Sequence, residues 1–360
     1  MDNSFKIPFY AKTALISISL FALIYTLNIA QNIIIPIVFA TIIAIVINPF
    51  VNYLTRKKIN HLVAIFIAVV LAILVVAGIF YIISSQISLF SESYPALKEK
   101  FNTTSTELMQ WFSKTFNVRQ SKINAWIKET QSEGISNFAF GEKLTEIGRL
   151  MITGMLLPVY LTMILYYKTL LLEFIRKLFR FEHHIAVAEV LVNTKNIIQS
   201  YLVGLFFEMI IVAAMNSAGL LILGIDYAFV LGITGAILNI IPYIGGLIAI
   251  ALPMIIAFVT KDISYSVMVF FLYIFIQFVD NHFIVPKIVA SRVQINALMS
   301  VIVVLIGAAI WGIPGMFLSI PLTAIVKVIF DHIEPLKPWG FLLGNIVPTA
   351  SKFSFINPKK

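Results

Sequence analysis

The sequence predicts an all-α, polytopic integral membrane protein with about eight membrane segments, two of them broken or re-entrant hairpins. Of its 360 residues, 60% are hydrophobic and only 12% are charged, whereas soluble domains carry roughly 25% charged residues. The apolar residues are grouped in runs of about 20, the length that a helix needs to cross the hydrocarbon core. Lipid must therefore cover much of the apolar surface.

Composition and motifs exclude several functional classes. The net charge is +9, but the basic residues form short clusters between apolar runs, which is typical of cytoplasmic loops and not of a nucleic-acid-binding stripe. The chain has no cysteine and no phosphate-binding loop, dinucleotide fingerprint or nucleophile elbow. Its five histidines show no metal-ligand spacing. We therefore expect no enzyme, no metal and no cofactor, apart from H⁺ or Na⁺ as a transported or coupling ion.

The amino-terminal membrane region is predicted to span residues 1–90. The apolar runs at 14–30 and 33–51 follow one another closely and predict a helical hairpin, and a third run covers 62–83. Residues 56–58 read Arg-Lys-Lys between the second and third runs. Because short basic loops stay in the cytoplasm, this loop and the amino terminus are expected there.

Two polar regions are predicted outside the membrane. Residues 91–149 carry Trp111, Trp126 and mixed charges at loosely helical spacing, which predicts a small helical extramembrane insert. Counting crossings places this insert on the outer face. Residues 336–360 form a basic tail that should lie in the cytoplasm, on the same side as the amino terminus.

The transport core is predicted between these regions, at residues 150–335. Its runs at 150–167, 201–223 and 265–285 each have the length of one crossing. A basic stretch after the first of these runs indicates another cytoplasmic loop. It contains Lys168, Arg176, Lys177 and Arg180.

Glu208 is the most informative single residue. It lies near the middle of run 201–223, where an ionised carboxylate is costly unless it is paired, hydrated or protonated. At helical spacing it shares a face with Tyr201, Gly204, Met215 and Gly219. Glu208 should therefore face protein or a cavity, either as a protonated acid bonded to a neighbouring helix or as a group that takes part in transport.

A second polar face closes the run at 265–285. It comprises Tyr273, Gln277, Asp280 and Asn281. Asp280 has two interpretations: an interfacial partner of Lys287 or Arg292, or an acid that lines the transport path. The candidate substrate or ion ligands on these two runs are Glu208, Gln277, Asp280 and Asn281.

Two further apolar runs are too long for one crossing and too interrupted for one helix: 227–259, broken at 239–246, and 297–330, broken at 312–315. Backbone groups freed at proline and glycine need protein or water partners. Each break is therefore either a re-entrant hairpin or a pair of thin, tilted crossings. Additional binding candidates are Asn239, Pro242, Tyr243 and Gly245, and hinge candidates are Gly246, Pro286, Gly312, Pro314, Gly315 and Pro321.

The order of these features resembles the autoinducer-2 exporter family of permeases. The relevant residues are Ile-Pro-Tyr-Ile-Gly at 241–245, Asp280-Asn281 followed by Pro286, and Gly312-x-x-Gly315 followed by Pro321. The resemblance covers nearly the whole chain and is most specific from residue 199 to 321. It differs at Gly246, where a proline is usual, and at Pro314, which interrupts a plainer stretch.

This resemblance implies a bacterial inner-membrane transporter that exports a signal molecule or another small solute and forms a homo-oligomer. Sodium or lithium exchange for protons is the alternative activity in the family. The residues leave two further classes open, a membrane-embedded enzyme and a channel-like structural assembly. We favour a secondary transporter, because intramembrane acids and broken helices then share one explanation. The expected partners are the lipid bilayer and a small solute or ion, without nucleic acid.

Overall fold

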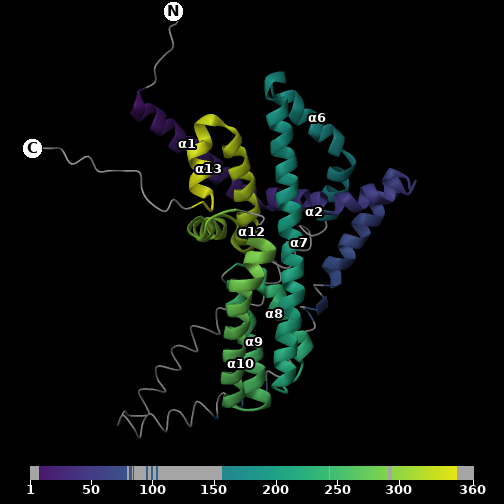
Figure 1. Cartoon of the computed structure of the whole chain (residues 1–360), viewed down its shortest axis with the longest axis vertical. Coiled ribbons are helices and arrows are strands. Elements are labelled where there is room, and N and C mark those ends of the chain that lie inside the picture. Colours follow the sequence, from purple (N-terminus) through teal and green to yellow (C-terminus); the bar gives the residue numbers. More distant parts are fainter. Residues whose placement is uncertain are drawn as a thin grey trace, which may run out of the picture. The chain divides into compact units, whose positions relative to one another are not determined.

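The computed structural model describes residues 8–78, 156–242, 244–290 and 294–346, together with six single positions between 81 and 103. Within these ranges every element is a helix, apart from an isolated bridge between Ile295 and Gly344 (Figure 1). Six of the helices are long and apolar enough to cross a membrane. These findings confirm an all-helical, polytopic membrane protein.

The first three predicted runs are helices. Helix α1 (Phe9–Ile29) and helix α2 (Gln31–Arg56) are separated by Ala30, and a third helix covers His61–Gly78. None of the residues of α1 is buried. The pairing of α1 with α2 as a hairpin stays a prediction, as do the domain boundaries, and the insert at 91–149 lies almost entirely outside the described residues.

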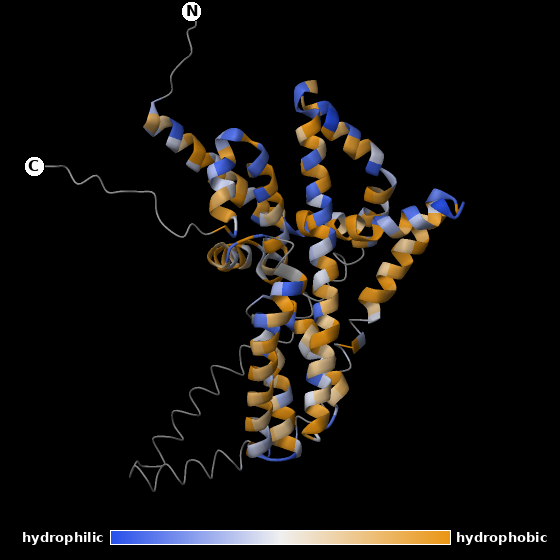
Figure 2. Ribbon diagram, viewed as in Figure 1, coloured by the Kyte–Doolittle hydropathy of each residue, from blue (hydrophilic) through white to orange (hydrophobic). Residues whose placement is uncertain are grey.

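The chain forms two compact units. Unit 1 consists of Met1–Ile35, Tyr167–Glu208 and Asp280–Lys360, and unit 2 consists of Pro36–Tyr166 and Met209–Val279. The long helix α7 (His184–Ile222) supplies residues to both units. In Figure 2, α8, α9 and α10 of unit 2 are coloured mainly as hydrophobic.

Unit 2 contains two apolar cores. The first joins α2, His61–Gly78 and the helix Leu156–Tyr166, with the small residues Ala40, Ala44, Ala64 and Ala68 almost fully buried. Small side chains let membrane helices approach closely. The second core joins the end of α7 to α8 (Ala228–Asn239), α9 (Ile244–Thr260) and α10 (Ile263–Val279).

Unit 1 packs the first half of α7 against α12 (Ala297–His332). Tyr201 and Ala324 are buried there among aliphatic side chains. The indole nitrogen of Trp311 donates to the carbonyl of Leu27 at 3.0 Å, which ties α12 to the end of α1. The short helices η4 (Glu334–Leu336) and α13 (Lys337–Leu343) complete the described part of the unit.

The basic stretch near Arg176 is helical, and its cytoplasmic location stays a prediction. It forms helix α6 (Lys168–Leu178), which follows the helix Leu156–Tyr166 after a break at residue 167. A 3-10 turn, η1 (Phe181–His183), then leads into the 39 residues of α7. The sequence of α6 is amphipathic, because five of its apolar residues share one face of the helix. Its charged residues lower the hydropathy of the stretch but are compatible with a helix: Lys168, Glu173, Arg176 and Lys177.

Both predicted breaks are present. Helix α8 ends at Asn239 and α9 begins at Ile244, and the two helices pack against each other. With 12 residues, α8 is about 18 Å long and cannot cross a hydrocarbon core of about 30 Å. Within α12 the chain turns sharply at Gly312, whose φ of 61° and ψ of −139° are not helical. Both geometries favour short helical hairpins over continuous crossings.

Candidate transport site

Glu208 lies on the buried face of α7. Its side chain is 8% exposed, and Gly204 and Tyr201, one and two turns earlier, are also buried. Its Oε2 atom has no hydrogen-bond partner among the described residues. The prediction that Glu208 does not face lipid is confirmed.

Asp280 begins a stretch of irregular helix. The chain leaves α10 at Val279 and forms two successive π-helical turns, η2 (Asp280–Ile284) and η3 (Pro286–Ala290). Asp280 is 2% exposed, whereas Asn281, Pro286 and Lys287 are exposed. Arg292, the other predicted partner, lies outside the described residues. Wide π turns are rare and are frequently found at functional sites.

The two acids belong to the same unit. Glu208 and Asp280 are the buried carboxylates among the described residues, both fall in unit 1, and their charges are near enough to act on each other. The buried hydroxyl of Tyr201 is also within the electrostatic reach of Glu208. Two carboxylates in a low-dielectric environment cannot both ionise cheaply. Such a pair can hold a proton or a small cation and release it.

The α8–α9 break contains a neutral polar contact. The amide of Gln277 on α10 donates to Asn239 Oδ1 at the end of α8, at 2.8 Å. A β-carbon at Gly246 would lie 3.0 Å from Gln277 Nε2 and 3.4 Å from Asn239 Oδ1, so the glycine keeps space for this contact. The structure therefore brings Asn239, Gln277 and Gly246 together.

The remaining residues of this break have structural surroundings. A β-carbon at Gly245 would collide with the carbonyl of Leu238, which explains the glycine at the tight approach of α9 to α8. Pro242 is half-buried. Tyr243 lies outside the described residues.

At the predicted hinge, the two halves of α12 pack closely against each other. A β-carbon on Gly307 would collide with the carbonyl of Gly315, and one on Gly315 with the carbonyl of Gly307. In a straight helix these residues would be about 12 Å apart. Pro314 is half-buried, and Pro321, two turns after the crossing, is buried.

Sequence reasoning missed a set of buried neutral residues in unit 2. Asn216, Thr234 and Tyr273 are 2%, 5% and 2% exposed, and each has a polar atom without a hydrogen-bond partner among the described residues. Tyr273 was assigned to a polar face, but the other two gave no periodic signal. Their only signature is one or two polar residues in an otherwise apolar run, Asn216-Ser217 and Thr234.

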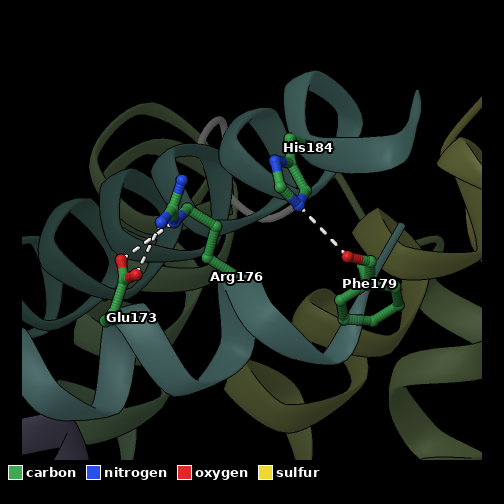
Figure 3. A network of polar contacts seen from close by, with 4 residues as sticks. All are labelled: Glu173, Arg176, Phe179 and His184. Carbon is green, nitrogen blue, oxygen red and sulfur yellow. Dashed lines mark hydrogen bonds and ion pairs between the residues drawn. The ribbon is translucent and has the colours of Figure 1, made fainter. Parts of the chain in front are cut away.

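The charged groups of α6 are on the surface. Glu173 and Arg176 form a two-pronged ion pair with distances of 2.6 and 2.9 Å, and His184 Nε2 lies 3.1 Å from the carbonyl of Phe179 (Figure 3). The hydrogen bond from Arg176 lowers the pKa of Glu173. Across the residues that the structure describes, no group of three or more His, Asp or Glu side chains is arranged to hold a metal ion.

Comparison with known proteins agrees with this architecture. Residues 15–334 match the family described as the AI-2E family transporter. Relatives include YueF of Bacillus subtilis, for which transport is a proposed role; it is 25% identical over 318 residues, covering 83% of each chain. A Haemophilus influenzae protein with the same proposed role is 25% identical over 327 residues, covering 89% of this chain and 92% of its own.

One relative has a named cargo. The AI-2 transport protein TqsA of Escherichia coli is 23% identical over 319 residues, which cover 88% of this chain and 91% of TqsA. The match over nearly the whole chain confirms the resemblance drawn from the Pro-Tyr-Ile-Gly and Gly-x-x-Gly segments.

Proposed function

This chain belongs to the AI-2E family of transporters, and from that premise we propose that it is a secondary transporter that exports a small solute, driven by a proton or sodium gradient. The name of TqsA suggests autoinducer-2 or a similar signal molecule as the solute. Ion exchange without a solute, as in a sodium or lithium/proton antiporter, is the alternative.

The observation that carries this proposal is the buried pair of Glu208 and Asp280. The chain has 17 acidic residues among 360, yet two of them are buried in membrane helices of one unit. Carboxylates inside the membrane are costly and mark ion pathways in many transporters. Binding of a proton or Na⁺ would relieve the repulsion between them and favour one conformation, and release would favour the other.

Irregular backbone in unit 1 supports a conformational role. Asp280 opens the π-helical turns, and Gly312 interrupts α12 with a conformation that suits glycine alone. Discontinuous helices are the elements that rearrange around the binding sites of many secondary transporters. We assign Gly312 and the π turns as the moving parts and the carboxylates as their switch.

The proposed membrane is the bacterial inner membrane, with both termini in the cytoplasm. The motive is that the basic residues at 56–58 and in α6 then lie on one side. Because the chain has no cysteine, Lys57→Cys and Lys177→Cys each give a single labelling site. An impermeant thiol reagent should label neither in intact cells and both after permeabilisation; labelling from outside would contradict this topology.

The test of function uses purified protein in sealed vesicles. Autoinducer-2 and ²²Na⁺ are offered under imposed proton or sodium gradients, and Glu208→Gln and Asp280→Asn are compared with the exposed control Glu182→Gln. We expect gradient-driven autoinducer-2 flux in the wild type and the control, and its loss in Glu208→Gln. Gradient-driven ²²Na⁺ exchange without solute flux would replace export with antiport. Unchanged pH and sodium dependence in both variants would reject carboxylate coupling.

A further inference from the structure

We propose that a neutral polar cluster inside unit 2 binds the transported solute, and that this solute is a small uncharged molecule that both donates and accepts hydrogen bonds. The cluster, here called the Gly235 cluster, consists of Asn216, Gly235 and Tyr273, together with Thr234, the residue that precedes Gly235 on α8. The inference rests on the proposed transport function, but it assigns recognition to a site other than the two carboxylates.

The geometry of the cluster centres on Gly235. A β-carbon on this glycine of α8 would lie 3.2 Å from Asn216 Nδ2 on α7, 3.2 Å from the Tyr273 hydroxyl on α10 and 3.7 Å from Ala249 Cβ on α9. Four helices therefore meet at one point, and two polar side chains flank it. Any larger side chain at position 235 would occupy the space next to both polar groups.

Asn216 and Tyr273 each have a polar atom without a protein partner among the described residues. Asn216 Nδ2 makes one long contact of 3.4 Å with the carbonyl of Gly232. Asn216 Oδ1 accepts no hydrogen bond from the described residues, and the Tyr273 hydroxyl forms none with them. A buried polar group that is left unpaired destabilises the folded protein. Retaining several of them in one core indicates a partner that is not part of the chain.

The neighbouring serines show that this core can satisfy its hydroxyl groups. Ser266 Oγ donates to the carbonyl of Met254 at 2.5 Å, and Ser217 Oγ to that of Phe229 at 3.5 Å. These bonds join α10 to α9 and α7 to α8. The unpaired groups of the Gly235 cluster are thus not a general property of the α7–α10 bundle.

Thr234 lacks a hydrogen bond that other threonines in the helices of this protein form. Thr41, Thr162, Thr260 and Thr323 each donate to the carbonyl four residues earlier, at 2.7–2.9 Å. Thr234 is more deeply buried than most, yet its Oγ1 has no partner among the described residues. The usual local bond of a threonine in a membrane helix is therefore missing at this site.

The chemistry of the cluster favours an uncharged ligand. The buried polar residues of unit 2 within the described ranges are all neutral. Asn216 offers an amide donor beside Gly235, which disfavours a bare cation, and a carboxylate or phosphate would find no cationic partner there. One helical turn further along α8 and α10, Asn239 and Gln277 provide a second neutral layer, about 6 Å away. Hydroxyl and carbonyl groups on a small solute complement both layers.

The experiment measures binding without a gradient, so that it is independent of coupling. Purified wild type, Tyr273→Phe and the control Tyr265→Phe on the same helix are heated in detergent with ribose, erythritol or glycerol as uncharged probes. Lactate, ethanolammonium, NaCl and LiCl are the charged probes. Any general osmolyte effect is common to all variants, and the difference between variants isolates specific binding.

We expect at least one uncharged probe to raise the melting temperature of the wild type and of Tyr265→Phe, with about three- to tenfold weaker apparent affinity in Tyr273→Phe. Without a probe, Tyr273→Phe should be as stable as the wild type or more so, because it removes an unpaired hydroxyl. In the single-cysteine variant Thr234→Cys, neutral methyl methanethiosulfonate should react faster than its charged analogues, and the binding probe should slow it.

Three results would overturn the inference. A melting shift with alkali salts that Tyr273→Phe abolishes would identify a cation site. Equal probe effects in wild type and Tyr273→Phe, with an unreactive Thr234→Cys, would identify a closed structural cluster. A fall in probe-free stability of Tyr273→Phe would show that the hydroxyl is paired in the protein. Gradient-driven flux that depends on Glu208 would survive each of these results, so the proposed function would remain separately testable.

Discussion

The two units bury polar groups of different kinds. Among the described residues, the buried acids Glu208 and Asp280 both belong to unit 1, whereas four of the five other buried polar residues belong to unit 2 and are uncharged: Asn216, Ser217, Thr234 and Ser266. Charge can respond to an ion gradient, and neutral groups can recognise a solute at any pH. Coupling to an ion and recognition of a solute can therefore reside in different parts of one chain.

The backbone differs in parallel with the charge. Unit 1 contains the π-helical turns after Val279 and the non-helical Gly312, whereas the core of unit 2 around α8, α9 and α10 is built from regular helices with a short break at 240–243. π turns are frequent at functional sites, and residues at the ends of elements often absorb the backbone changes of a conformational transition. We therefore expect unit 1 to move and the Gly235 cluster to keep its shape.

The largest expected effect concerns the helix crossing in unit 1. Gly315→Val should destabilise the protein by about 3 kcal/mol or more, because its side chain meets the carbonyl of Gly307 and not a movable side chain. Gly312→Ala should cost about 1–3 kcal/mol through its positive φ. Thermal unfolding in detergent, with size-exclusion chromatography of the folded fraction, measures both.

Gly78→Ala is the matched control, since a β-carbon there has no heavy atom within 4 Å. It should leave stability unchanged or raise it by at most about 1 kcal/mol. If Gly315→Val unfolds no more easily than Gly78→Ala, the two halves of α12 do not cross at Gly307 and Gly315, and the irregular character assigned to unit 1 is wrong.

The next effect tests whether the two units divide the work. Glu208→Gln should lower gradient-driven flux by about tenfold or more while leaving solute binding unchanged. Tyr273→Phe should weaken binding by about three- to tenfold and leave the pH and sodium dependence of the remaining flux unchanged. Flux in vesicles and melting shifts in detergent measure the two properties separately. If each variant alters both properties equally, recognition and coupling share one site.

Some of the features that distinguish the two units could be predicted from the sequence. Glu208 stands alone in an apolar run, so its burial against protein follows from the cost of exposing a carboxylate to lipid. The two breaks were identifiable because proline and glycine interrupt runs that are too long for one crossing. Such predictions depend on the free energy of one segment in the membrane, which the sequence of that segment determines.

Other features depend on tertiary contacts. The π turn at Asp280 has no sequence signature, because the residues from Asp280 to Ile284 could form an ordinary α-helix end. Asn216 and Thr234 gain meaning only when α8 brings Gly235 between α7 and α10. The basic residues of α6 predict a cytoplasmic connection, but their charge alone does not indicate a helix. These features depend on how the helices pack against one another.

A smaller effect is expected at the neutral contact of the α8–α9 break. Asn239→Leu and Gln277→Leu each remove one partner of a half-buried hydrogen bond of 2.8 Å. Each should cost about 1 kcal/mol, and the double-mutant cycle should give a coupling energy of about 0.5–1.5 kcal/mol. Reversible unfolding in mixed detergent micelles provides the free energies. Strict additivity of the two changes would show that the contact does not hold the break together.

The smallest effect belongs to a carboxylate of unit 1 that is not buried. Arg176 lowers the pKa of Glu173 below its ordinary value of 4.5 through a hydrogen bond, but both side chains are about half exposed, and water screens their attraction. A carboxyl group with a lowered pKa stabilises the folded state above pH 4.5 and loses this contribution as the pH falls through its folded value. Glu173→Gln should therefore lower the melting temperature slightly at pH 7 in low salt, and not at all at acid pH or in high salt. Glu182→Gln, which also removes one exposed carboxylate, is the control for the change in surface charge. Both variants should retain gradient-driven flux. If Glu173→Gln impaired flux as strongly as Glu208→Gln, burial would not be what distinguishes a coupling carboxylate from a surface one.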